Sequence, residues 1–262
     1  MRDIPLVNEF RRNIADAARD GDAAFFTWFD SGDNVDATFV KGAWDFAAHI
    51  AQPVTDLISA PETKTALEIG HGGGRLLAAA GGFFGQVIGI DVHAENDRVQ
   101  EALERKGLTN CTLLNTAGDA IPLPDESVDL VYSFIVLQHL GEYSLFEQYL
   151  REAYRTLKPG GLAVLYFGRK HTFSLDTDSK PLYAMDRFLE PARLPNGYRE
   201  LAAKANDITL LVSLRHARKT AGRSGFETLK NLVSFRRTPS TALLYGRQNG
   251  LVLRKPVAGR HD

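Results

Sequence analysis

Four residues at regular spacing, Glu68, Gly70, Gly72 and Gly74, form the pattern in this chain that most clearly indicates chemistry. An apolar run precedes the first glycine and a helix-forming run follows the last one. A tight glycine turn between a strand and a helix brings backbone N–H groups and the positive end of the helix up to a ligand. Glycine suits this turn because a Cβ would hinder positive φ values and a close approach. The pattern therefore predicts a ligand-binding turn.

A carboxylate, Asp91, ends the next apolar run along the chain. At the tip of a second strand, such a side chain can accept hydrogen bonds from both hydroxyls of a ribose. Its distance in sequence from Gly70 is also typical of proteins that bind NAD. Asp91 therefore predicts a nucleoside ligand without identifying which one.

Three further stretches complete the pattern. Gly118-Asp119-Ala120 follows a third apolar run, residues 122–133 read PLPDESVDLVYS, and residues 157–161 read LKPGG. Together with the glycine turn, they closely resemble the class I S-adenosylmethionine-dependent methyltransferase family, in particular its type-11-like domain. The resemblance covers residues 60–168, with a weaker likeness up to residue 255.

The resemblance implies that S-adenosylmethionine is the cofactor. In the family, the loop after the third strand supplies a backbone N–H and a carboxylate to the adenine edge, and Asp119 with Ala120 matches it. The implied cofactor-binding residues are Glu68, Gly70, His71, Gly72, Gly74, Asp91, Val92, Asp119, Ala120 and Ser133.

The rival interpretation is a nicotinamide-dependent oxidoreductase. Gly70 and Gly72 fit the fingerprint Gly-x-Gly-x-x-Gly, but its third glycine position holds Arg75. Tyr154 and Lys158 have the spacing of the catalytic pair of short-chain dehydrogenases, yet Pro159 follows at once and ends the helix. The sequence therefore favours the methyltransferase.

Alternating strands and helices must position these residues. We predict strands at 65–69, 86–90, 112–115, 128–133, 162–167, 226–235 and 251–255, and helices at 75–80, 94–106, 143–157 and 213–223. This order predicts a Rossmann-like α/β fold: a doubly wound, mostly parallel seven-stranded sheet with an antiparallel last strand. We expect an N-terminal helical cap at 1–60 and a cofactor-binding domain at 61–262, in which 171–206 form a lid or insertion.

Methyl transfer from a sulfonium needs a base only when the acceptor arrives protonated. His139, just past the fourth strand, is the candidate catalytic residue, because that loop lines the methyl-transfer face in the family. A structural role for this histidine is equally open. Trp44, His139 and His171 are candidate substrate contacts. The histidines lack metal-ligand spacing, so we expect no metal.

The composition limits the partners. The net charge is −1, with 31 basic and 32 acidic residues, so no overall attraction to nucleic acid or to a membrane is expected. We interpret Arg215, Arg218, Lys219 and Arg223 as a solvated helix face. One cysteine and no apolar leader favour a cytoplasmic protein.

We therefore expect an enzyme that methylates a small molecule, on oxygen in preference to nitrogen or carbon. The alternatives are a non-catalytic scaffold subunit that binds S-adenosylmethionine and, less favoured, the oxidoreductase. The sequence does not indicate the oligomeric state.

Overall fold

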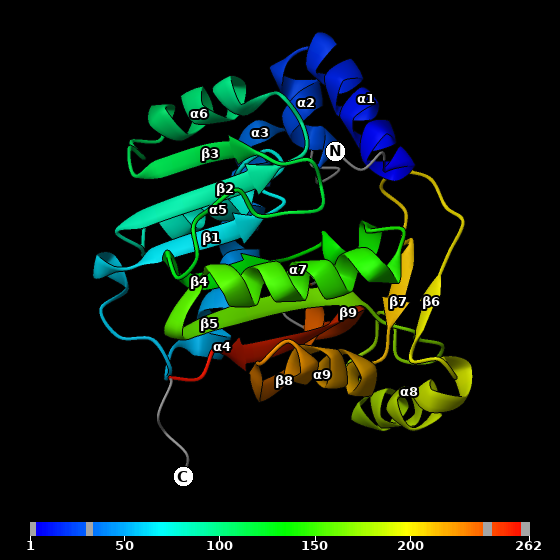
Figure 1. Ribbon diagram of the computed structural model, residues 1–262. Coiled ribbons are helices and arrows are strands. Elements are labelled where there is room, and N and C mark those ends of the chain that lie inside the picture. The colour runs from blue at the N-terminus through cyan, green and yellow to red at the C-terminus, as the bar shows by residue number, and fades with distance from the viewer. Residues whose placement is uncertain (1–3, 30–33, 238–242, 258–262) are drawn as a thin grey trace.

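The computed structural model describes residues 4–29, 34–237 and 243–257, and its centre is one twisted sheet flanked by helices (Figure 1). The strands of this sheet are β1 Thr65–Ile69, β2 Gln86–Asp91, β3 Cys111–Asn115, β4 Val128–Ser133, β5 Leu157–Gly168, β6 Tyr198–Glu200, β7 Leu210–Val212, β8 Glu227–Arg237 and β9 Leu243–Arg254.

The strand order places the predicted sites together. Parallel strands run in the order β3-β2-β1-β4-β5, so the chain reverses its direction of winding between β1 and β4. β9 pairs antiparallel with β5, and β8 pairs antiparallel with β9. This confirms the predicted doubly wound sheet with a reversed last strand. In such sheets, ligands bind at the carboxyl ends of the strands beside the reversal.

The α-helices of the described residues are α1 Pro5–Arg19, α2 Asp22–Trp28, α3 Val35–Asp45, α4 Gln52–Val54, α5 Arg75–Gly81, α6 Asn96–Arg105, α7 Tyr143–Thr156, α8 Lys180–Arg193 and α9 Leu214–Arg223. A π-helix at Phe46–Ala51 joins α3 to α4. The N-terminal segment is thus mainly helical, as expected. No helix in the described ranges is long and apolar enough to cross a bilayer.

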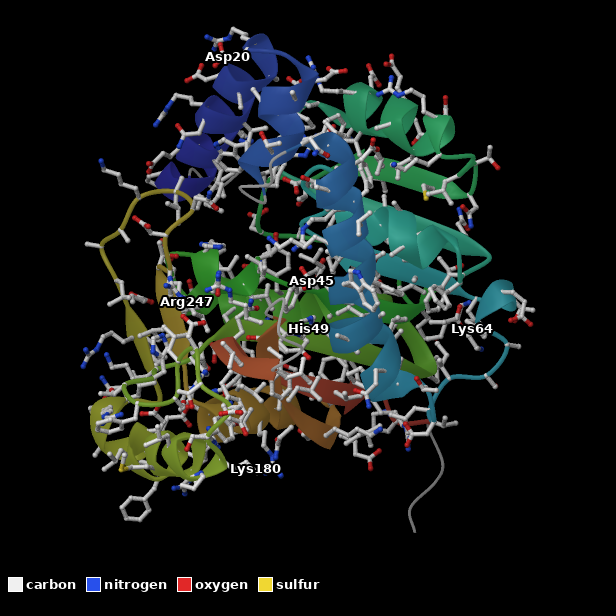
Figure 2. The ribbon with its side chains drawn as sticks, turned by 180° about the vertical axis from the view of Figure 1, so that it is seen from behind. Asp20, Asp45, His49, Lys64, Lys180 and Arg247 are labelled. Atoms are coloured by element: carbon white, nitrogen blue, oxygen red, sulfur yellow. The ribbon has the colours of Figure 1, made fainter. Side chains whose placement is uncertain are left out.

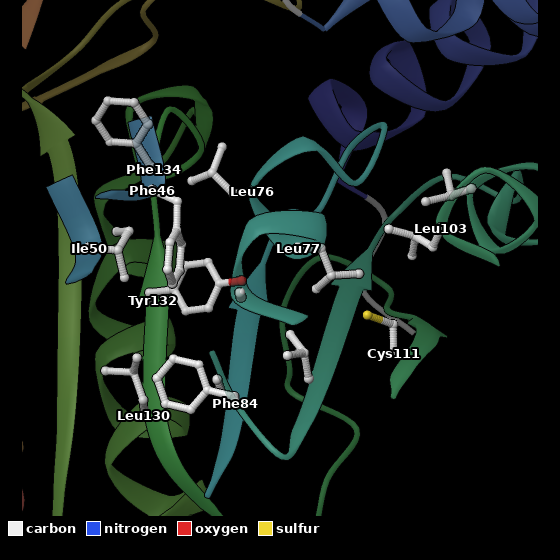
Figure 3. Close-up of a cluster of buried hydrophobic side chains, with 14 of the residues drawn as sticks. Phe46, Ile50, Leu76, Leu77, Phe84, Leu103, Cys111, Leu130, Tyr132 and Phe134 are labelled. Carbon is white, nitrogen blue, oxygen red and sulfur yellow. The ribbon is translucent and has the colours of Figure 1, made fainter. Parts of the chain in front are cut away.

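Buried side chains form one layer on each face of the sheet, because successive strand residues point to opposite sides. Ala66 belongs to the layer beneath α3 and α5, whereas Leu67 belongs to the layer beneath α7 and α9. Figure 3 shows part of the first layer, in which Phe46 and Ile50 pack beside Tyr132 of β4. The N-terminal aromatic residues therefore extend the core.

The segment 171–206, expected to be a lid or insertion, contains regular secondary structure. It contains α8 and β6, and the antiparallel pair β6–β7 adds two strands to the expected seven. Two prolines of this segment are compatible with α8, since Pro181 lies in its first turn and Pro191 in its last. Asp186, buried on α8, accepts the backbone N–H of Ser174 at 2.9 Å and so ties this segment to the helix.

Candidate cofactor and active site

A cleft lies between the carboxyl ends of β1, β2 and β4 and the inner sides of α1 and α2. Its empty volume is about 1100 Å³, part of which is open to solvent. Many of the predicted site residues meet on its wall: Glu68, Gly70, His71, Gly72, Asp91, Val92 and His139.

The glycine turn has the geometry that its sequence requires. Gly70 has a φ of +77°, and a Cβ there would lie 2.4 Å from Cγ2 of Val136. The N–H of Gly70 donates to the carbonyl of Ile90 at 2.8 Å, which holds the turn against β2. Gly74 is outside the cleft wall, and a Cβ there would lie 2.8 Å from Cγ1 of Val99. The turn thus needs glycine at position 70, where it lines the cleft, and at position 74, where it packs on α6.

Backbone groups fix the Asp91 carboxylate at the tip of β2. Its Oδ2 accepts the N–H of Gly72 at 2.8 Å, and its Oδ1 accepts the N–H of Val92 at 2.6 Å. Burial alone would raise the pKa of this carboxyl, but His93, His71 and these N–H groups hold the pKa below its ordinary value. Asp91 is therefore an ionised, immobile acceptor with lone pairs to spare, as a ribose diol requires.

Glu68 is a second buried carboxyl on the cleft wall, and it is 3% exposed. Burial raises its pKa well above the ordinary value, against the opposing charge of Arg75. The Tyr132 hydroxyl donates to Glu68 at 3.2 Å. Arg75 itself donates to Asp45 at 2.6 Å. In Figure 2, which views the molecule from behind, Asp45 lies on the helical run that crosses in front of the sheet. Glu68 is thus incompletely compensated, which fits a cationic group of a ligand.

His71 and His93 lie edge to face beside Asp91, with ring centroids 5.0 Å apart. His93 Nδ1 accepts the N–H of Glu95, so its Nε2 carries the hydrogen and donates to the carbonyl of Gly72 at 3.0 Å. His71 Nδ1 lies 2.9 Å from the same carbonyl, and its buried Nε2 has no hydrogen-bond partner among the described residues.

The same two histidines and Asp91 bring potential metal-ligand atoms within 4.8 Å of one another. The spacing in sequence gave no sign of this cluster. However, both nitrogens of His93 already take part in hydrogen bonds. A metal bound to His93 Nε2 would replace the hydrogen that this nitrogen donates to Gly72. The ring hydrogen would then lie on Nδ1, where it would face the N–H of Glu95, and two donors would oppose each other. The expectation of a site without metal is therefore kept as a prediction.

His139 lies in the short turn Leu137–His139 that follows β4, on the cleft wall. Its Nδ1 donates to the carbonyl of Asp207, so Nε2 keeps its lone pair, which accepts from the Gln138 amide at 3.0 Å. Burial lowers the pKa of His139 below its ordinary value, so the ring is neutral at pH 7. This neutral tautomer is the one that a general base needs.

Besides Gly74, three more predicted cofactor residues lie beside the cleft, outside its wall. Ser133 is fully buried, and its hydroxyl donates to the carbonyl of Ile69 at 3.1 Å, which ties β4 to β1. Asp119 and Ala120 directly follow Gly118, which does line the cleft. Their assignment to the adenine edge remains a prediction.

The structure places two predicted substrate contacts, Trp44 and His171, away from the cleft. Trp44 is 56% exposed, because α3 turns Phe39 and Gly42 to the core and residue 44 to the other side. His171 follows β5, but the chain there turns towards α8, where Asp186 accepts the N–H of Thr172. Neither residue lines the cleft, and their role as substrate contacts stays a prediction.

Residues of the N-terminal helices close the cleft instead, and the sequence did not single them out. Arg11 donates to the carbonyl of Val92 at 2.9 Å and to that of Thr116 at 3.2 Å, so it joins the loops after β2 and β3. Phe10, Trp28 and Phe29 form an aromatic wall. The bonds of Arg11 span 81 and 105 residues, and no local pattern indicates such distant partners.

The strand order, the glycine turn after β1 and the carboxylate at the tip of β2 define a nucleoside-binding Rossmann-like domain. A family model described as a methyltransferase domain matches residues 67–165. Residues 67–165 are thus a methyltransferase domain, and this part of the chain is similar to class I methyltransferases, whose cofactor is S-adenosylmethionine.

Relatives of known name support this assignment. An uncharacterized methyltransferase of Schizosaccharomyces pombe is 33% identical over 125 residues, which are 46% of this chain and 45% of that protein. A probable S-adenosylmethionine-dependent methyltransferase of Mycolicibacterium smegmatis is 37% identical over 68 residues, 25% of each chain. The matches span less than half the length of these curated relatives.

Solved structures show the same fold. The structure of an S-adenosylmethionine-dependent methyltransferase of Methanosarcina mazei has a TM-score of 0.54 and 18% identity to this chain. The match covers 78% of this chain and 97% of that one.

Proposed function

We propose that this protein transfers the methyl group of S-adenosylmethionine to a small-molecule acceptor, with oxygen as the favoured acceptor atom. One observation carries the choice of oxygen: His139, neutral and with an Nε2 lone pair, lines the same cleft as the glycine turn and Asp91. An alcohol or phenol must lose a proton on methylation, and a positioned imidazole can take it.

The residues of the cleft fit this cofactor. Asp91 would hold the ribose hydroxyls, and the backbone of the glycine turn would lie against the ligand. Glu68 would face the α-amino group of the methionine part. When bound, S-adenosylmethionine supplies an electrophilic methyl group whose leaving group is neutral, so no general acid is required.

The rest of the wall favours an acceptor with an apolar body. Leu6, Phe10, Trp28 and Leu140 line the cleft, and such side chains exclude water from the reacting groups. Aromatic faces also attract a sulfonium. His139 would then accept the hydroxyl proton at Nε2 once the acceptor has displaced the Gln138 amide. The absence of nucleic-acid and membrane partners remains part of this proposal.

The oxidoreductase alternative has little support. Phe26 and Phe29 pack on Gly73, on the approach that a pyrophosphate would take to α5. Tyr154 packs edge to face on Phe226, and Lys158 donates to Asp129 at 2.8 Å, so these two residues do not form a nicotinamide site. The scaffold alternative also predicts binding of S-adenosylmethionine, so only a measurement of turnover distinguishes it from the enzyme.

To identify the acceptor, the release of S-adenosylhomocysteine is measured with panels of alcohols, phenols, amines and compounds that have an acidic C–H group. With an oxygen acceptor, we expect His139→Asn to lower kcat/KM by about 10²–10⁴-fold. The wild-type activity should fall as the pH drops through the lowered pKa of His139, below 6.5, and the variant should lose this acidic limb.

His171→Asn distinguishes the two histidines that the sequence proposed. A loss of activity in this variant, with none in His139→Asn, would overturn the assignment of the base. Turnover with amines alone would overturn the choice of oxygen, and no turnover with any panel would favour the scaffold.

A further inference from the structure

A second hollow, separate from the cofactor cleft, lies where α9 meets α8 and β8. Its volume is about 820 Å³, including the part open to solvent, and its walls are Arg187, Leu214, Arg215, Arg218, Lys219, Thr228 and Asn231. It shares no lining residue with the cleft. Figure 1 shows α8, α9 and β8 together at the end of the molecule away from α1 and α2.

The charges around this hollow are largely uncompensated. Arg187 pairs with Glu190 at 2.6 Å. Arg215, Arg218 and Lys219 have no acidic partner among the residues that the structure describes. Among the described residues, no carboxylate lines the hollow. Its field is therefore strongly positive although the whole chain has a net charge of −1.

The arrangement opposes the stability of α9 itself. Arg215, Arg218 and Lys219 are three or four residues apart, and like charges at that spacing repel one another on a helix. Arg215 lies in the first turn, which holds no acidic residue, and a cation there opposes the helix dipole. Arg223, at the favourable end, does have a partner, Glu147 at 3.0 Å. A bound anion would relieve the repulsion inside the hollow.

We propose that this hollow binds a compact oligophosphate, either free or as the diphosphate part of a small molecule. Guanidinium groups bind phosphate oxygens in pairs of parallel hydrogen bonds. The side chains of Thr228 and Asn231 add neutral hydrogen-bonding groups on the β8 side. None of the lining residues is aromatic, so the hollow lacks the stacking surfaces with which proteins bind single-stranded nucleic acid.

The test is calorimetric titration of the full chain with inorganic pyrophosphate, tripolyphosphate, uridine diphosphate and a single-stranded oligoribonucleotide at constant ionic strength. The double variant Arg215→Gln/Arg218→Gln should weaken pyrophosphate binding by about tenfold or more. Arg215→Lys/Arg218→Lys should retain part of the affinity. Tighter binding of uridine diphosphate than of pyrophosphate would identify the small-molecule source, and the reverse order the free anion.

The matched control is Arg105→Gln/Arg151→Gln, which removes the same charge from exposed positions outside the hollow. Equal weakening in this control would overturn the proposal, because general electrostatics would then explain the binding. The absence of saturable binding by any phosphate, or binding of the oligoribonucleotide alone, would also overturn it. Equal melting temperatures show that the variants are folded.

Discussion

Asp91 and Glu68 are buried carboxyls of one cleft, yet their surroundings shift their pKa values in opposite directions. Backbone N–H groups and histidines lower the pKa of Asp91, whereas burial dominates at Glu68 and raises its pKa. The sequence predicted both residues from a motif and a strand end. It did not predict this difference, because the difference depends on Tyr132, Arg75 and His93, which reach the site from other elements.

The raised pKa of Glu68 predicts that its carboxyl lowers the stability of the fold while it serves cofactor binding. Since folding favours the protonated form, the ionised carboxyl costs stability as the pH rises above 4.5 towards the raised pKa. Glu68→Gln removes this cost, so we expect it to melt higher than wild type at pH 8, by roughly 2–4 °C per kcal/mol gained. The advantage should shrink towards pH 4.5, while cofactor binding should weaken.

Thermal unfolding followed by circular dichroism across this pH range checks the prediction. If the wild type melts higher than the variant at pH 8, the ionised carboxyl stabilises the empty protein, and our account of Glu68 is wrong.

At the scale of elements, the sequence predicted most of what positions the site. Periodicity and glycine placement located the glycine turn and four of the five parallel strands to within about one residue, whereas β5 begins at Leu157 and not at the predicted residue 162. The sequence did not predict α8 within the segment 171–206, although prolines are compatible with a helix when they fall in its first and last turns. The sequence did not predict that Trp44 lies outside the cleft wall, because the direction of a side chain on α3 depends on which helix face meets the core.

The glycine turn offers a test in which backbone strain and close contact are separable. Gly70 and Gly107 have nearly equal φ values, +77° and +78°, but a Cβ meets Val136 at Gly70 and nothing within 4 Å at Gly107. Gly107→Ala should therefore cost only the backbone strain, about 1–2 kcal/mol. Gly70→Ala should cost clearly more and abolish cofactor binding.

Urea unfolding measures the free energy of unfolding of both variants. Calorimetric titration with the cofactor then measures binding by each variant that is folded. Equal losses of stability, with cofactor binding retained in Gly70→Ala, would show that the close approach at the turn does not matter.

At the scale of the whole molecule, the N-terminal helices and the sheet form the cofactor cleft together. The sequence predicted a helical cap, but not that Arg11 would hold two loops of the sheet or that Phe29 would pack on Gly72. The backbone N–H of Ala205 also donates to Glu9 at 3.1 Å, so the segment before β7 reaches α1 as well. Such contacts form when distant segments pack together, and no periodic pattern in the sequence indicates them.

The central claim is that this cleft binds S-adenosylmethionine through Asp91. The most direct measurement is calorimetric titration with S-adenosylmethionine, S-adenosylhomocysteine and NAD on the wild type, on Asp91→Asn and on the exposed control Asp97→Asn. We expect micromolar binding of both adenosyl ligands, about −8 kcal/mol, unchanged in Asp97→Asn and at least about tenfold weaker in Asp91→Asn. Binding of NAD alone, or equal affinity in all three proteins, would contradict the claim.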